Sequence, residues 1–307
     1  MRIEANGIDV SNFIGTVTWS GDVTQMARKL AFTYLYTNLS TDIEAVEINT
    51  GNRILAYDDS GYLIFDGIVI TEEFEETDIK KSITAADYAF YLKNKVYGEF
   101  KGNPAQVVRK VLSMFAIPAG EILEAAGDIN ILAAGDKTIY QIIEEAYGAE
   151  ADGVYIKMTG TTLNIEKIGT ICVGTYTGDD FVTSAKYKSS IENMVNTVAI
   201  IDGNSRLVNR ISNEDDLIYG VIQEVYKHDD EKKNAIDEAR KLMKSVENSS
   251  SITINGDYSV TAGTSIIVEK VNSRIQGLFK ITSDSHSITN GQHTTTITLD
   301  FTKVMVI

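Results

Sequence analysis

The C-terminal stretch of the chain alternates threonine with apolar residues from Thr294 to Phe301. A period of two places alternate side chains on opposite faces of a β-strand, so that one face can be buried while the other stays available. A second strand-like run, Gly277 to His286, precedes it, and a turn that contains Gly291 separates the two. We therefore predict that the chain ends in two β-strands joined by a glycine-containing turn.

The composition is typical of a globular protein. A length of 307 residues suffices for about two domains of ~100–200 residues each. Hydrophobic residues make up 43% and charged residues 23%, which argues against extensive disorder. Only two residues are proline, and this scarcity fits long paired strands, because proline removes hydrogen bonds from a sheet.

The net charge of −15 argues against stable nucleic-acid binding, which needs clustered lysine and arginine to displace counterions from phosphates. The same charge would suit a channel wall past which DNA or protein slides without sticking. Its simpler interpretation is solubility.

The amino terminus, Met1 to Val10, alternates charged and apolar residues and has no basic region followed by an apolar core. We therefore expect no signal peptide. Charges or glycines interrupt every apolar run, such as Ile129 to Ala134, before it reaches the ~18 residues of a membrane helix. The expectation is a soluble protein made in the cytoplasm, without membrane insertion. Cys172 is the single cysteine, which excludes an intrachain disulfide and a cysteine-based zinc site.

Three regions follow one another along the chain. Residues 1–97 are predicted to form a first β domain with a brief helical segment at Ala86–Leu92. Turn clusters such as Ser20–Asp22 and Asp58–Gly61 separate its short strands, a spacing typical of a barrel or sandwich. The expected strands are Ile3–Val10, Thr16–Trp19, Leu30–Tyr36, Ala45–Asn49, Arg53–Tyr57, Tyr62–Glu73 and Lys80–Thr84.

Residues 98–174 are predicted to form a small α+β domain. Asn103 and Pro104 are typical of a helix start, and an apolar stripe follows before Pro118. A second helix is expected after Thr138, with Gln141 completing a capping box and Gly148 ending the helix. A hairpin is expected from Gly153–Met158 and Thr162–Ile168.

Residues 175–307 are predicted to form a second β domain that contains one amphipathic helix near 230–248. Asp229 or Asp230 would cap this helix, which would run from Glu231 to Val246 and end at Asn248–Ser251. Its mixed charges favour packing on its own domain over lying on a membrane. The further expected strands are Val195–Ile201, Leu217–Tyr226, Ile252–Gly256, Ser265–Lys270 and the two at the C-terminus. The predicted fold is mainly β, with two β-barrel-like domains flanking an α+β insertion.

No pattern in the sequence predicts catalysis, a cofactor or a metal site. His228 is expected at a solvated strand end, whereas His286 and His293 flank the final turn and could face each other, with Asp284 as a further metal ligand. The strand pattern explains that pair better. The acidic doublets lie in predicted turns, where aspartate bonds the local backbone, and none has EF-hand spacing: Asp58–Asp59, Asp179–Asp180 and Asp215–Asp216. Nucleophile elbows, Walker loops and dinucleotide fingerprints are all lacking.

The C-terminal pattern, a G-x-F-x-I-x-S-x-x-H strand, a glycine turn and a threonine-rich closing strand, resembles that of the late-control D and XkdQ-like baseplate hub proteins. These belong to contractile phage tails and to PBSX-type phage-tail-like particles, including R-type bacteriocins. Further segments resemble the same family in the same order, so that the resemblance spans nearly the whole chain: Ile83–Asp87, Gly102–Val107, Lys137–Ile143, Leu163–Ile168, Ser190–Val198 and Tyr219–Gly220.

This resemblance implies a structural role without catalysis. It implies a homotrimer in which each chain supplies two β-domains to a pseudo-sixfold ring that joins the inner tube to the central spike. The implied partners are further copies of the chain, the spike protein, an inner tube or tube-initiator protein, and tape-measure and LysM-type baseplate proteins. The tail particle or virion would be the final location.

Two other functions stay open at this stage. A β-rich tail module that binds glycans or receptors would display exposed aromatic side chains. A glycoside hydrolase would use two aspartate or glutamate residues as acid and base.

Overall fold

A computed structural model describes residues 1–35, 46–74, 79–148, 153–178, 181–228, 234–272 and 275–305. The chain divides into two compact units: residues 1–185 together with 251–307, and residues 186–250. The prediction of a mainly β fold with an α+β insertion is confirmed. None of the helices in the described ranges combines the length and apolarity needed to cross a membrane.

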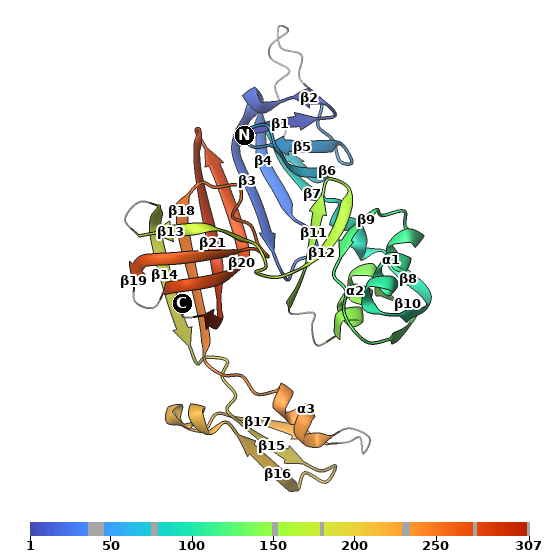
Figure 1. The fold of residues 1–307 in the computed structure, drawn as a ribbon, viewed down its shortest axis with the longest axis vertical. Coiled ribbons are helices and arrows are strands. Elements are labelled where there is room, and N and C mark those ends of the chain that lie inside the picture. The colour runs from blue at the N-terminus through green and yellow to red at the C-terminus, as the bar shows by residue number, and fades with distance from the viewer. Residues whose placement is uncertain are drawn as a thin grey trace. The chain divides into compact units, whose positions relative to one another are not determined.

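A sheet of thirteen strands dominates the larger unit (Figure 1). Its main path runs β14-β18-β21-β20-β3-β4-β7-β6-β5-β1-β2, and β13 and β19 join it through β20. Strands from both ends of the sequence therefore share one sheet. The strands are β1 (Arg2–Ala5), β2 (Ile8–Asp9), β3 (Ile14–Asp22), β4 (Lys29–Leu35), β5 (Arg53–Tyr57), β6 (Leu63–Phe74), β7 (Lys80–Asp87), β13 (Cys172–Thr177), β14 (Val182–Ser190), β18 (Glu247–Asn255), β19 (Ser265–Asn272), β20 (Ile275–Thr289) and β21 (Gln292–Met305).

The two predicted C-terminal strands are confirmed as the antiparallel pair β20 and β21, with Thr289 opposite Gln292. The second half of β20 also pairs with β3, from Ser283 opposite Asp22 to Ile288 opposite Val17. This pairing connects the first β region to the last. A buried apolar cluster that includes Trp19 lies against the strands of the first β region, and Phe279 of β20 is also buried.

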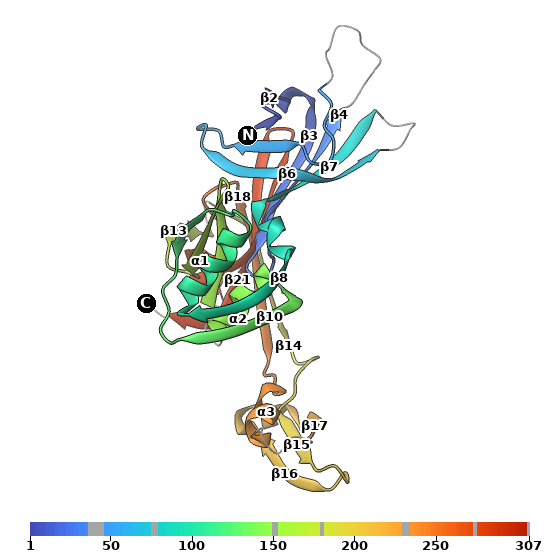
Figure 2. The ribbon, with the colours of Figure 1, turned by 90° about the vertical axis from the view of Figure 1, so that its right-hand side faces the viewer.

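The α+β segment has its own core and lies in the larger unit (Figure 2). Both predicted helix caps are confirmed, and each forms a capping box, Asn103 with Gln106 and Thr138 with Gln141. The predicted hairpin is confirmed as β11 with β12. The buried faces of α1 and α2 pack on this core. The elements are β8 (Lys95–Gly102), α1 (Pro104–Met114), β9 (Ala119–Ile122), β10 (Ile129–Thr138), α2 (Ile139–Tyr147), β11 (Val154–Thr159) and β12 (Thr162–Lys167). The 3-10 helix Tyr88–Lys93 directly precedes β8, and another, Ser11–Phe13, lies between β2 and β3.

Among its described residues, the smaller unit has a three-stranded sheet, one α-helix and a 3-10 helix. Its strand order is β16-β15-β17, with β15 parallel to β17. Val198 and Ile200 of the central strand pack on Ala239 of α3. The elements are β15 (Thr197–Ile201), β16 (Leu207–Ser212), the 3-10 helix Glu214–Tyr219, β17 (Gln223–Lys227) and α3 (Ala235–Lys241).

The prediction of a helix from Glu231 to Val246 is too long. Within the described residues α3 covers only Ala235–Lys241, and the Asn234 side chain caps it by accepting a hydrogen bond from the Ile236 N–H. The chain leaves the helix because Lys244 exchanges backbone hydrogen bonds with Val195. The expected caps Asp229 and Asp230 lie outside the described residues. Asn248–Ser251, expected as a helix terminator, belongs to β18.

Two further boundary predictions are wrong because distant residues decide them. Ser20–Asp22 is no turn, since its residues pair with Ser283–Ser285 of β20 and extend β3. Residues 217–219 are 3-10 helix instead of strand. The Asn196 side chain explains this: it donates to the carbonyls of Asp216 and Gly220 and accepts from the Ile222 N–H, which holds the segment in a compact turn.

We expect Asn103→Ala to destabilise the α+β segment by about 1 kcal/mol, because it removes the acceptor for the Gln106 N–H. Asn103→Asp keeps the acceptor and should stay near the wild-type value. Native-state hydrogen exchange of the α1 amides measures the difference. Equal protection in the two variants would contradict the capping argument.

Candidate functional site

A buried ion pair fastens β3 to β20. Arg28, between β3 and β4, donates from its two terminal nitrogens to the two carboxylate oxygens of Asp284 on β20, at 2.8 and 2.5 Å. The side chains are 13% and 0% exposed, and the Ala262 N–H donates a further hydrogen bond to Asp284. Burial raises the pKa of Asp284, but Arg28 and His286 outweigh this effect and hold the pKa below its usual value. Asp284 therefore stays ionised at neutral pH.

The two predicted histidines meet beside this ion pair. His286 Nδ1 lies 3.1 Å from His293 Nε2, and His286 Nε2 lies 3.1 Å from the Val260 carbonyl and 3.3 Å from Asp284. The pKa of His293 is lowered to about 4, mainly because the ring is partly buried and also because His286 lies beside it. Thr295, which is also buried, bonds His286 Nδ1. Within the described residues no group of three or more His, Cys, Asp and Glu side chains is arranged to hold a metal.

Aromatic rings continue this cluster on both sides. The Arg28 guanidinium carbon lies 4.2 Å from the Trp19 ring centre, and Trp19 lies 4.6 Å from the His286 ring. Tyr258 packs on His293 at 4.2 Å. Trp19, Asp284, His286 and Thr295 are buried. The cluster therefore joins β3 to β20 along their line of pairing, which we call the seam.

A cleft of about 490 Å³ opens beside the seam. Three separate stretches of the chain form its walls: the first β region, the β11–β12 hairpin and the loop before β19. The lining is rich in aromatic rings and also carries both charges. It consists of Trp19, Arg28, Tyr62, Leu63, Ile64, Phe65, Asp66, Asp87, Tyr155, Lys157, Met158, Thr159, Gly160, Tyr258, Ser259 and Thr261.

Asp87 is the most perturbed carboxyl group in this cleft. Its oxygens accept hydrogen bonds from the backbone N–H groups of Arg28 and Ala89, at 3.2 and 3.0 Å. Burial raises the pKa of Asp87 to about 7, although these hydrogen bonds and the Arg28 charge oppose the shift. Tyr155 lies in the same electrostatic environment, since burial raises its pKa while Arg28 lowers it.

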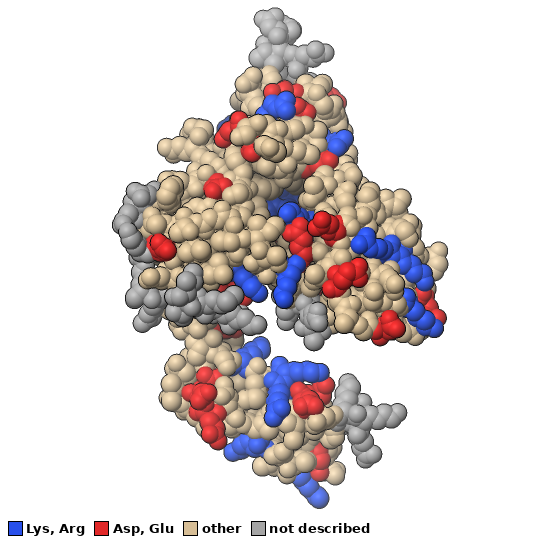
Figure 3. Space-filling model, viewed as in Figure 1, with Lys and Arg blue, Asp and Glu red and all other residues tan. Residues whose placement is uncertain are grey.

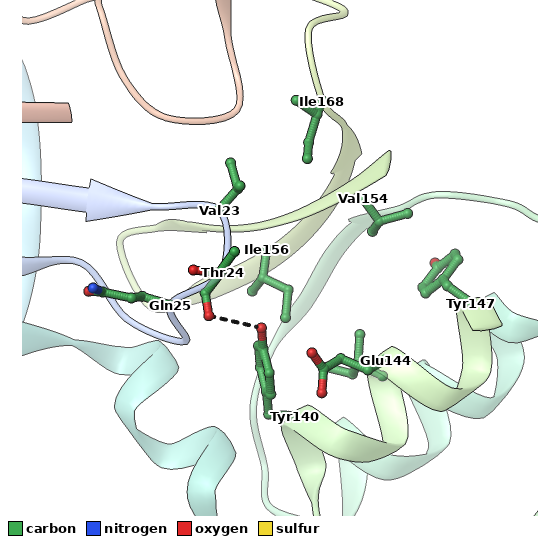
Figure 4. A pocket seen from close by; sticks show the side chains of 10 residues that line it. Val23, Thr24, Gln25, Tyr140, Glu144, Tyr147, Val154, Ile156 and Ile168 are labelled. Carbon is green, nitrogen blue, oxygen red and sulfur yellow. Dashed lines mark hydrogen bonds between the residues drawn. The ribbon is translucent and has the colours of Figure 1, made fainter. Parts of the chain in front are cut away.

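A smaller cavity of about 180 Å³ lies where α2 meets the turn after β3. Figure 4 shows Tyr140 extending from α2 to Thr24, whose carbonyl accepts its hydrogen bond at 3.5 Å. Val23, Val154 and Ile156 complete a mostly apolar wall. The cavity lies where the α+β segment packs against the turn that follows β3 of the large sheet.

The other sequence candidates lie apart from the cleft lining. Asp58 accepts hydrogen bonds from the N–H groups of Ser60 and Tyr62, as a turn aspartate does. Asp215 and Asp216 lie in the first turn of a 3-10 helix. Asp179–Asp180 lies outside the described residues. His228 is half-buried at the end of β17. Sequence reasoning missed Arg28 and Asp87, because no local pattern marks a residue whose partner lies far away in the chain.

Acidic and basic side chains are interspersed on the face drawn in Figure 3. A single-sign basic stripe, as nucleic-acid binding requires, does not cover that face.

A model of the YQBQ-like family matches residues 17–300. The chain belongs to the YQBQ-like family. None of the curated proteins matches this YQBQ-like chain. Its fold is nevertheless found in solved structures of tail proteins.

Three of these structures cover nearly the whole of this YQBQ-like protein. The 43 kDa tail protein of prophage MuSo2 from Shewanella oneidensis has a TM-score of 0.75 at 15% identity, with 97% of each chain covered. The tail protein from Neisseria meningitidis MC58 has a TM-score of 0.69 at 12% identity, covering 99% of this chain and 96% of that one. The E. coli c3393 protein, a type VI secretion component similar to the T4 tail proteins gp27 and gp5, has a TM-score of 0.59 at 8% identity, with 97% and 76% covered. At these identities the likeness establishes the fold.

We expect Arg28→Met to cost roughly 3–5 kcal/mol, because it leaves the Asp284 carboxylate buried without its cation. Adding Asp284→Asn should recover part of this loss, since the uncompensated charge is then gone. Denaturant unfolding of the two single variants and the double variant gives the coupling energy. Lys101→Met breaks an exposed pair with Glu99 and should lower the stability much less, because water screens exposed ion pairs. If the stability losses of the two single variants simply add up in the double variant, Arg28 and Asp284 act independently and the argument is wrong.

We expect Asp87→Asn to change how stability depends on pH. The folded protein keeps the Asp87 proton up to about pH 7, whereas the unfolded chain releases it near pH 4. The folded state thus binds more protons in this window, and the contribution of Asp87 to stability falls as pH rises through it. As the pH rises from 4 to 8, the free energy of unfolding of the variant should therefore increase by a few kcal/mol relative to that of the wild type. Urea unfolding at several pH values measures this. Asp128→Asn removes a carboxyl group at an exposed position and serves as the matched control.

Proposed function

We propose that this YQBQ-like protein is a structural baseplate hub of a contractile tail or tail-like particle. The observation that carries the proposal is the fold likeness over 97% of both chains to a prophage tail protein. The likeness to a type VI secretion component that itself resembles tail proteins supports the same class of assembly. In this proposal the chain is a hub of the late-control D and XkdQ-like kind.

The proposed assembly is a homotrimeric ring with pseudo-sixfold symmetry. Residues 1–97 and 175–307 would each supply one sixth of the ring, and residues 98–174 would form the α+β domain between them. The sheet gives this arrangement a physical basis, because its terminal strands β2 and β14 each pair on one side only among the described strands. Pairing between chains would protect such edges.

The proposed mechanism is mechanical. One end of the ring would receive the central spike and the other would continue into the inner tube, so that thrust from the contracting sheath passes through the hub. The ladder between β3 and β20 lies within one chain and would carry load between its two β regions. The buried cluster of Arg28, Asp284 and His286 lies at this same pairing of β3 with β20. Its groups bond to one another, which supports a structural role without enzymatic activity.

The proposed partners are further copies of the chain, the spike and an inner tube or tube-initiator protein, with tape-measure and LysM-type baseplate proteins as neighbours. The hub would assemble in the bacterial cytoplasm and leave the cell as part of the virion or bacteriocin-like particle.

Quantitative peptide mass spectrometry of purified tail particles tests the hub proposal. We expect about three copies per particle, in a one-to-one ratio to the subunits of a trimeric spike and at half the number of a hexameric tube ring. The spike and tube proteins of the same particles serve as internal standards. Absence from intact particles, or a copy number in the range of a fibre or sheath protein, would contradict the proposal.

A further inference from the structure

The cleft beside the seam is a formed pocket with an accessible mouth. Tyr62 and Leu63 on its rim are 76% and 45% exposed. Deeper in, Asp66 and Asp87 are both only 5% exposed. At protein interfaces, the side chains that contribute most to binding commonly fill desolvated pockets.

The charges that line the cleft are paired, with one exception. Arg28 is engaged by Asp284, and Asp66 accepts two hydrogen bonds from Arg53 at 2.9 and 2.7 Å. Lys157 lies 3.5 Å from Glu166. Asp87 forms no ion pair with any cation of the described residues, and its acceptors are used only by two backbone N–H groups. Each carboxylate oxygen can accept a further hydrogen bond.

We propose that this cleft is a docking pocket for an arginine side chain carried on an extended segment of a partner protein, with Asp87 as the anion that receives the guanidinium. The pocket recognises this occupant through charge complementarity at Asp87 and through the rings around it. The proposal goes beyond the hub role and does not depend on it.

Arginine fits this pocket better than lysine. Its planar guanidinium can stack on aromatic faces and offer paired donors to one carboxylate, whereas the lysine ammonium is compact and strongly hydrated. Tyr155 and Tyr258 supply aromatic lining. Arg28 already lies over Trp19 in the same way, which shows that this environment accommodates a guanidinium.

The energetics point in the same direction. Burial disfavours the Asp87 carboxylate, whose pKa is raised to about 7. An incoming cation removes this penalty, because a charge pair in a desolvated site is far more favourable than one buried anion. The exposed apolar rim then contacts the residues that flank the arginine.

The test uses a capped tripeptide with a central arginine as the probe and the full-length chain as the target. A matched tripeptide carries citrulline, which has nearly the same shape without the charge. In an NMR titration at pH 8, we expect the arginine peptide to shift the backbone amides of Asp87 and Ala89 saturably, with an affinity at least tenfold above that of the citrulline peptide. Equal binding of the two peptides would overturn the proposal.

Two variants and one control locate the site. Asp87→Asn should weaken binding of the arginine peptide at least tenfold, whereas Asp128→Asn, which makes the same charge change at an exposed position, should leave it unchanged. Thr159→Trp places bulk at an exposed residue of the cleft lining without altering Asp87 and should also abolish binding while the fold persists. Full binding by either cleft variant would overturn the assignment. So would saturable occupation of the cleft by chitotetraose, a neutral oligosaccharide, in preference to the arginine peptide.

Discussion

The pairing of β3 with β20 holds the two ends of the sequence in one sheet. Arg28 and Asp284 are 256 positions apart, yet their ion pair lies where Asp22 to Ser20 pair with Ser283 to Ser285. Without this pairing β3 and β20 would each present an open edge, and such edges invite association with other chains. The ion pair also limits where the strands can slide, because a one-residue shift would turn Asp284 to the opposite face of the sheet. Register, burial of the charges and continuity of the sheet thus depend on one another.

The same pairing explains the position of the cleft. The α+β segment lies between the two β regions in sequence, so that closing β3 on β20 brings the β11–β12 hairpin and the loop before β19 to one place. Contacts of such long sequence separation close a large loop, which costs chain entropy and slows folding. Gly21 is part of this closure, because a side-chain carbon at that position would collide with the Arg28 guanidinium. A single long-range contact therefore shapes both the joint and the pocket.

Local signals predicted much of the fold. The caps at Asn103 and Thr138 and the final hairpin could be read from the sequence, because the residues that form them lie within a few positions of one another. The same reasoning failed at Ser20–Asp22 and at residues 217–219, where β20 and Asn196 decide the structure from a distance. The meeting of His286 and His293 was anticipated because they flank one turn. Arg28 and Asp87 were not, since single charged residues in a β-rich chain carry no mark of their partners.

The cleft and the neighbouring ion pair differ in how the fold compensates their charged groups. The neighbouring ion pair and His286 are engaged by internal hydrogen bonds, although the Arg28 Nε has no hydrogen-bond partner among the described residues. Asp87 differs because the fold supplies two backbone donors but no ion pair with a cation of the described residues, and the charge of Arg28 only partly offsets the effect of burial. Natural sequences depart from internal consistency mainly where function requires it. A carboxyl group that the fold leaves uncompensated beside a rigid joint would gain most from a cation supplied by a partner, so that docking there would also stabilise the stretches of chain that meet at the seam.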